Sequence, residues 1–106
     1  MPKYLIEASY TADGVKGVAA KGGTARREAV GQLISSVGGN MESFHFAFGA
    51  ADALVICELP GDEVAAALAM SINQSGTTTV RTVVLLTPEQ VDSAAQAVPD
   101  YRAPGG

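Results

Sequence analysis

Apolar and polar residues alternate along four stretches of the chain, and this alternation predicts four β-strands. The strands are expected at residues 3–10, 41–48, 53–59 and 77–86. Only Gly49-Ala50-Ala51-Asp52 separates the second stretch from the third, which is short enough for a tight turn. We therefore expect these two strands to form a hairpin.

A different spacing predicts three helices between and after the strands. Apolar residues recur at i, i+3, i+4 and i+7 from Val30 to Val37, which predicts a helix that begins at Ala25 with Thr24 as its N-cap. A second helix is expected from Asp62, after the Pro-Gly turn, to Asn73. A third follows Thr87-Pro88-Glu89-Gln90, which has the pattern of a capping box. Residues 14–20 are expected to form only a short helical turn, because Gly17 weakens it.

The predicted order of strands and helices is β-α-β-β-α-β-α. This order predicts an α+β, ferredoxin-like βαββαβ domain with a C-terminal helix. Right-handed crossovers then give an antiparallel sheet of strand order 4-1-3-2, with the helices on one face. We expect one domain over residues 1–98. The tail over residues 99–106 has two prolines and two terminal glycines, and we expect it to be flexible.

The strands offer apolar side chains on both faces of the sheet, although helices cover only one. Helices are expected over Tyr4, Ile6, Ala8, Phe44, Phe46 and Phe48. The opposite face still carries Leu5, Val83 and Leu85, and a large exposed apolar face is typical of a partner or ligand site. We expect a second copy of the sheet to cover it, which gives a homodimer or higher homo-oligomer with a dimeric α+β barrel.

Three polar residues interrupt that second apolar face, namely Glu7, His45 and Arg81. Glu7 and Arg81 lie on neighbouring strands, so they are expected about 5 Å apart across the ladder. One strand separates Glu7 from His45, which places them about 10 Å apart. That distance does not make a catalytic pair, but it allows the side chains to line a small cavity from two sides.

Charge and composition exclude several classes of function. The net charge is −4, and the seven basic residues do not form the basic stripe that nucleic-acid binding requires. No apolar run is long enough to span a membrane, and no leader segment is recognised at the N-terminus. The single cysteine, Cys57, excludes an internal disulfide, and no Cys/His spacing predicts a metal site. We expect a cytoplasmic protein of bacterial type, without cofactor.

Several segments together resemble one known family. The turn Gly49-Ala50-Ala51-Asp52 is followed by an apolar strand, an acidic turn at residues 61–63, an alanine-rich helix and a threonine-rich strand. This arrangement resembles the GYD-domain family, which has Gly-x-Tyr-Asp at the turn. Residues 10–15 and the basic pair Arg26-Arg27 also look like the family's pattern. Ala51 stands where the signature tyrosine belongs, so only Gly49 and Asp52 remain.

The resemblance implies a ferredoxin-like fold in the dimeric α+β barrel group, but it implies no defined activity. Our first hypothesis is an oligomer that binds a small apolar or aromatic molecule between sheet and helices or at the subunit interface. Glu7, His45, Asp52 and Arg81 are the candidate ligand-binding residues. The first alternative is a cofactor-independent enzyme of oxygenase, isomerase or cyclase type with His45 as acid or base, because imidazole titrates near neutral pH. The second is a structural or regulatory subunit without ligand.

Each candidate also has a purely structural interpretation. His45 would then fill an interface, and Glu7 would pair with Arg81. The carboxylate of Asp52 would accept backbone N–H groups in its turn. Cys57 is expected to behave as a small buried apolar residue, because the sequence shows no activating partner for its thiol.

Overall fold

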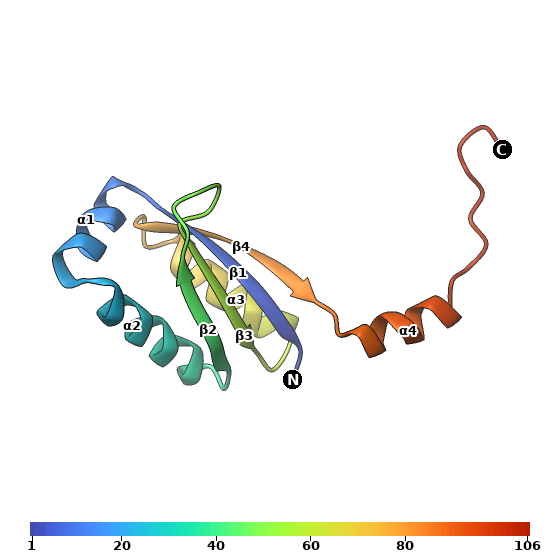
Figure 1. The fold of residues 1–106 in the computed structure, drawn as a ribbon, viewed down its shortest axis with the longest axis horizontal. Coiled ribbons are helices and arrows are strands. Elements are labelled where there is room, and N and C mark those ends of the chain that lie inside the picture. The colour runs from blue at the N-terminus through green and yellow to red at the C-terminus, as the bar shows by residue number, and fades with distance from the viewer.

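The computed structural model describes all residues from 1 to 106 and contains four strands and four helices. In chain order these are β1 (Lys3–Tyr10), α1 (Ala12–Lys21), α2 (Gly23–Ser36), β2 (Asn40–Phe46), β3 (Ala53–Glu58), α3 (Asp62–Asn73), β4 (Thr78–Leu85) and α4 (Pro88–Gln96). Figure 1 shows the strands side by side, with α4 and the C-terminal tail projecting away from them.

The sheet has the order β2-β3-β1-β4, and every neighbouring pair is antiparallel. This confirms the predicted α+β, ferredoxin-like arrangement with order 4-1-3-2 and a C-terminal helix. The strands alternate in burial because successive side chains point to opposite faces. In β1 the buried positions are Tyr4, Ile6 and Ala8, and in β3 they are Ala53, Val55 and Cys57.

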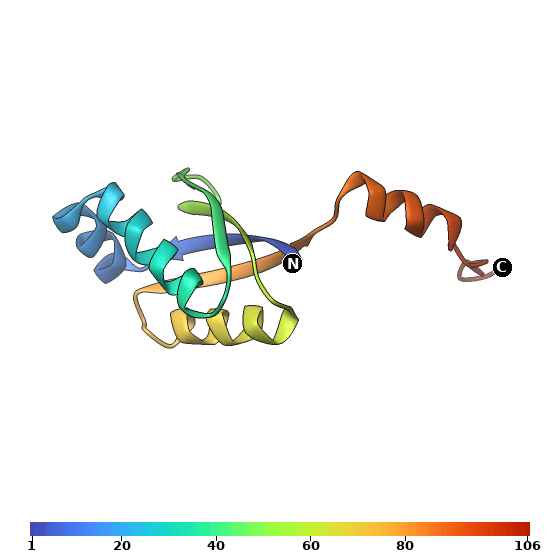
Figure 2. The ribbon, with the colours of Figure 1, turned by 90° about the horizontal axis from the view of Figure 1, so that it is seen from below.

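Helices α2 and α3 both pack on this buried face of the sheet. Ile34 of α2 and Leu68 of α3 are buried in the same cluster as Tyr4, Ile6 and Val55. Figure 2 shows the body of the molecule from below, with α4 again separate from it. The opposite face of the sheet has no helix over it, and we call it the open face; it carries Leu5, Glu7, His45, Leu54, Ile56, Arg81 and Val83.

The segment before α2 differs from its prediction. Residues 12–21 form a helix of ten residues, α1, rather than a short turn. Its N-cap is Thr11, whose hydroxyl accepts from the backbone N–H of Gly14. Thr24 is not an N-cap, because α2 already begins at Gly23 and Gly22 occupies the capping position. The α1–α2 junction is therefore a sharp bend at Gly22, where φ is +88°.

Two further local predictions have opposite outcomes. The capping box of α4 is confirmed, since Thr87 and Gln90 each bond the other's backbone N–H. Of the three phenylalanines expected in the core, only Phe44 packs against the core cluster, whereas Phe46 is half-buried and Phe48 is 68% exposed. The strand ends at Phe46 and the chain turns at Phe48, whose φ is +53°. Its ring stacks on Phe46 with centroids 5.7 Å apart.

Candidate functional site

Two regions of the molecule bring polar side chains next to apolar ones. The first is the open face. There Glu7 of β1 pairs with Arg81 of β4 across the ladder, and the two side chains form an ion pair at 3.9 Å between Oε2 and Nε. The structure therefore confirms that Glu7 and Arg81 are neighbours across the β1–β4 ladder.

His45 lies on the same face but apart from that pair. It is opposite Leu54 of β3, and Leu54 is in turn opposite Glu7. One complete strand thus separates the histidine from the carboxylate, a distance of about 10 Å. The side chain of His45 is exposed and forms no hydrogen bond within the chain. No neighbour within the chain selects a tautomer of this imidazole.

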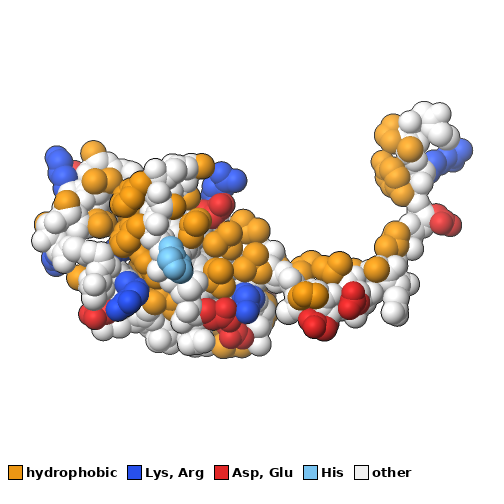
Figure 3. Space-filling view, in the orientation of Figure 1, with side chains coloured by type: hydrophobic (Ala, Val, Ile, Leu, Met, Phe, Trp, Pro, Cys, Tyr) orange, Lys and Arg blue, Asp and Glu red, His pale blue; other side chains and the backbone are white.

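The centre of the open face is apolar. Leu5 lies between Ile56 on one side and Val83 on the other. Beyond this row, Lys3 forms an ion pair with Glu42 at 2.9 Å, and this contact raises the pKa of the Lys3 ammonium. Figure 3 shows the single histidine beside hydrophobic side chains, with acidic and basic side chains adjacent to one another on this side of the molecule.

Asp52 has a structural position at the end of the hairpin. Its carboxylate accepts the backbone N–H of Tyr10 at 2.9 Å, and its own N–H donates to the carbonyl of Ala8 at 2.8 Å. The turn residue Ala51 accepts the N–H of Gly49 through its carbonyl. Asp52 therefore ties the β2–β3 turn to the end of β1, and it lies away from Glu7 and Arg81 along the strand.

Two buried groups have raised pKa values. Burial raises the pKa of the Cys57 thiol to about 11. The hydroxyl of Tyr4 donates to Asp62 Oδ1 at 2.6 Å, and this hydrogen bond raises the pKa of Tyr4 to about 12. Both groups are thus kept protonated at neutral pH. No group of three or more His, Cys, Asp or Glu side chains is arranged to hold a metal ion, and no helix is both long and apolar enough to cross a membrane.

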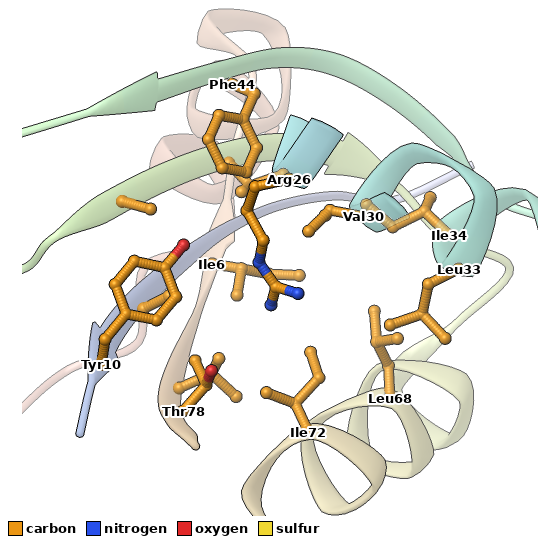
Figure 4. A pocket seen from close by; sticks show the side chains of 14 residues that line it. Ile6, Tyr10, Arg26, Val30, Leu33, Ile34, Phe44, Leu68, Ile72 and Thr78 are labelled. Carbon is orange, nitrogen blue, oxygen red and sulfur yellow. The ribbon is translucent and has the colours of Figure 1, made fainter. Parts of the chain in front are cut away.

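The second region is a cavity between the buried face of the sheet and helices α2 and α3, which we call the inner cavity. Its volume is about 20 Å³, close to that of one water-sized space. Apart from Arg26 and Thr78, its lining is apolar or aromatic, and it includes Ile6, Val30, Leu33, Phe44 and Ile72. Figure 4 shows these side chains around the guanidinium of Arg26, which points into the space between them.

Arg26 has no ionic partner in this cavity. Its Nε is buried and has no hydrogen-bond partner, and none of the ion pairs in the molecule includes it. Its guanidinium carbon lies 5.8 Å from the centroid of the Tyr10 ring. That contact is a cation–π interaction, which attracts the charge but does not neutralise it.

A larger groove lies beside the inner cavity, and we call it the side groove. It has a volume of about 370 Å³ and is lined mainly by α1 and α2. Tyr10, Arg26 and Thr78 line both spaces, so these three side chains form the boundary between them. The other charged residues of the side groove are Asp13 and Lys21.

None of the four residues predicted to bind ligand lies in these two spaces. Glu7, His45 and Arg81 are on the other side of the sheet, and Asp52 is engaged in its turn. Arg26 was noted only as part of a basic pair. The signal that could have found it is the helix spacing, because Arg26 precedes Val30 and Leu33 by four and seven residues and so shares their buried stripe.

The comparisons with known proteins identify a family. The family model described as the GYD domain matches residues 4–95, and this confirms the resemblance seen in the sequence. The matched range includes the sheet apart from Lys3, and most of α4. Neither the comparison with curated proteins nor the comparison with solved structures found a match.

Proposed function

The chain belongs to the GYD-domain family, and we propose that it is a homodimeric domain that binds a small apolar or aromatic molecule between its sheet and its helices. The observation that carries this proposal is the apolar inner cavity, which is separated from the side groove only by the side chains of Tyr10, Arg26 and Thr78. The side groove has the volume expected of a small-molecule site, and the inner cavity supplies the apolar lining that such sites need.

A flexible side chain limits the inner cavity. The stem and head of Arg26 occupy the space between Tyr10 and the apolar residues of α2 and α3 (Figure 4). An arginine side chain has many rotamers, and we expect it to move aside when a ligand enters. A ring that enters from the side groove would then contact Val30, Phe44 and Ile72, where it gains the free energy of apolar burial.

The open face supports the proposal that a second copy of the chain binds to the first. Its central row of Leu5, Ile56 and Val83 would remain in contact with water in a single chain. The rows on both sides of this centre each carry both signs of charge, through the Glu7–Arg81 and Lys3–Glu42 pairs. A face with both signs can meet its own copy across a two-fold axis without like charges having to coincide. We therefore expect a second copy of this chain, rather than a strongly charged partner, to cover the open face.

Titration with a neutral aromatic probe tests the ligand site. We expect 1-naphthamide to shift the NMR signals of the methyl groups of Val30, Leu33 and Ile72, which line the inner cavity. The methyl groups of Val15 and Val91 are exposed elsewhere and serve as an internal control. Shifts confined to the open face, or no saturable shift at all, would contradict binding between sheet and helices.

Light scattering on two matched variants tests the dimer. Val83 on the open face is 41% exposed and Val15 on α1 is 46% exposed, so a change to glutamate is equally tolerable for folding at both sites. We expect twice the chain mass of 10.8 kDa for the wild type and for Val15→Glu, and the single-chain mass for Val83→Glu. A wild-type monomer at micromolar concentration would rule out the dimer.

A further inference from the structure

The position of Arg26 has an energetic cost that the rest of the fold does not offset. A guanidinium stays charged at every pH at which proteins fold. Burial of one of its donors without a partner costs a free energy comparable to a lost charged hydrogen bond. The head forms a cation–π contact with the ring of Tyr10 but no ion pair. A leucine or methionine at this position on the stripe of α2 would fill the same space without that cost.

We propose that the molecule bound between sheet and helices carries an anionic group, a carboxylate, which pairs with Arg26 at the boundary between the inner cavity and the side groove. This inference rests on the proposed function, and it adds the chemical class of the ligand. Arginine binds a carboxylate through two parallel N–H···O bonds, which satisfies the donors that the chain leaves free. The ligand is then an aromatic or apolar monocarboxylic acid.

The charges around the boundary favour one negative charge on the ligand. Lys21 and Asp13 line the side groove with opposite signs, so their charges cancel to first order. Arg26 remains as a single uncompensated positive charge. A dianion such as a phosphate monoester would leave one negative charge without a positive partner. A monocarboxylate matches the single positive charge.

The start of α2 does not add to this preference, which rests on Arg26. Gly22 and Ala25 line the side groove, and they lie at the N-cap and first turn of α2. No side chain caps this helix and its first turn holds no acidic residue. Gly22 is also the C-cap of α1, so the negative end of one helix dipole lies at the positive end of the other and the two offset each other.

The direction of the ligand follows from the lining. The inner cavity is apolar apart from Arg26 and Thr78, whereas the side groove is open and more polar. The ring of the ligand therefore lies inside, in the space that the arginine now limits, and the carboxylate faces the side groove. The guanidinium turns outward with the anion, and this movement enlarges the apolar space.

A matched pair of probes tests the charge of the ligand. 1-Naphthoate and 1-naphthamide share one ring system and differ in the charge of the substituent. We expect calorimetric titration of the wild type at pH 7 to show roughly 10- to 100-fold tighter binding of the naphthoate, the factor that corresponds to a hydrogen bond with a charged group. Equal affinities would overturn the inference and leave the proposed function intact. Failure of both probes to bind would reject both.

Two neighbouring arginines give the variant and its control. Arg26→Gln removes the charge and keeps a polar side chain, and we expect the ratio of the two affinities to fall to about one. Arg27→Gln changes the net charge equally, but Arg27 is exposed and lines neither space, so its ratio should equal that of the wild type. A preference for naphthoate that survives in Arg26→Gln, or disappears in Arg27→Gln, would overturn the assignment.

Thermal stability without ligand separates a binding role from a structural one. Arg26→Met keeps the length of the side chain and removes the unpaired charge. If Arg26 serves the ligand, this variant should melt at a higher temperature than the wild type while it loses the preference for naphthoate. A clearly lower melting temperature would show that the guanidinium supports the fold, and it would contradict the inference.

Discussion

Tyr4 and Asp62 illustrate how a single side-chain contact joins distant parts of the chain. They are 58 residues apart in sequence, and the 2.6 Å hydrogen bond between them fastens β1 to the first turn of α3. The ring of Tyr4 is fully buried against the helices. The raised pKa of Tyr4 also makes this contact dependent on pH, because the tyrosinate can no longer donate the hydrogen bond.

Tyr4→Phe tests this contact. The pKa of Tyr4 rises from 10.0 to about 12 on folding, so its contribution to stability is complete below pH 10 and is lost as the pH rises through 12. We expect the variant to melt a few degrees below the wild type at pH 8, and the difference should shrink toward pH 12. Tyr101 is 79% exposed, so Tyr101→Phe is the control and should leave the melting temperature unchanged at both pH values. A difference that grows with pH would contradict the assignment.

Cys57 leads to a prediction about reactivity. Its thiol is buried in β3, and burial raises its pKa to about 11, so very little thiolate is present at pH 8. We expect iodoacetamide to label the folded protein at least tenfold more slowly than the protein in denaturant. Mass spectrometry after timed quenching measures both rates. Equally fast labelling would mean that β3 opens readily or that the thiol is activated.

The sequence allowed contacts to be proposed between residues on neighbouring strands of the sheet. Strand order made the Glu7–Arg81 pair a hypothesis, because the sequence does not fix the register, and the ladder confirms the pair. The inward position of Arg26 was missed, because sequence-based reasoning expects a charge on the solvent side of a helix. Arg26 lies one turn before Val30, the first apolar residue of the buried stripe of α2, so only an extension of this stripe toward the N-terminus would have included it. The exposure of Phe48 was also missed, since the alternating pattern continues through a residue that in fact turns with positive φ.

Among the secondary-structure elements, α1 shows how close packing can override propensity. Gly17 suggested only a short helical turn, yet the helix has ten residues and contains Gly14 as well. Gly14 is required by a close approach, because a Cβ at this position would lie 2.1 Å from the carbonyl oxygen of Thr77. Gly17 has no such neighbour within 4 Å. Low helix propensity in this segment thus reflects the contact between α1 and the start of β4, and not the absence of a helix.

Alanine at each of the two glycines gives opposite predicted effects. Gly14→Ala forces α1 away from Thr77, and we expect it to lower the free energy of unfolding by about 1–3 kcal/mol. Gly17→Ala adds a methyl group to an exposed helix position with free space, and we expect it to raise the free energy of unfolding by about 0.5–1 kcal/mol. Urea denaturation measures both. Equal effects of the two substitutions would show that α1 does not pack on β4 in solution.

At the scale of the whole molecule, the four strands and helices α2 and α3 of the body were predictable because tertiary packing and local pattern agree, whereas α1 was not. The hairpin, the order of the sheet and the capping box of α4 all follow from short patterns in the sequence. The placement of α4 does not, because it packs against no other element of the chain. Figure 1 shows it beyond the end of β4, and Val91 of α4 and Val98 just after it are exposed.

The tail offers a test at this scale. Within residues 99–106 the hydrogen bonds are internal, from Arg102 to Gly106 and from Gly106 to Ala103, and Tyr101 is exposed. We expect a chain that ends at Val98 to keep its melting temperature and its mass by light scattering. A loss of stability would show that Tyr101 docks in the assembled protein, and a loss of mass would place the tail in the interface.

The projection of α4 also means that this short chain does not unfold in a single step. A helix of nine residues is too short to persist in water without packing, so in a lone chain α4 is expected to melt while the sheet is still intact. The ellipticity at 222 nm will then decline before the near-ultraviolet signal of the buried Tyr4 changes. Backbone amides of residues 88–96 will exchange with deuterium as fast as those of a free peptide. Slower exchange of these amides as the protein is concentrated would report that a second copy has covered the helix.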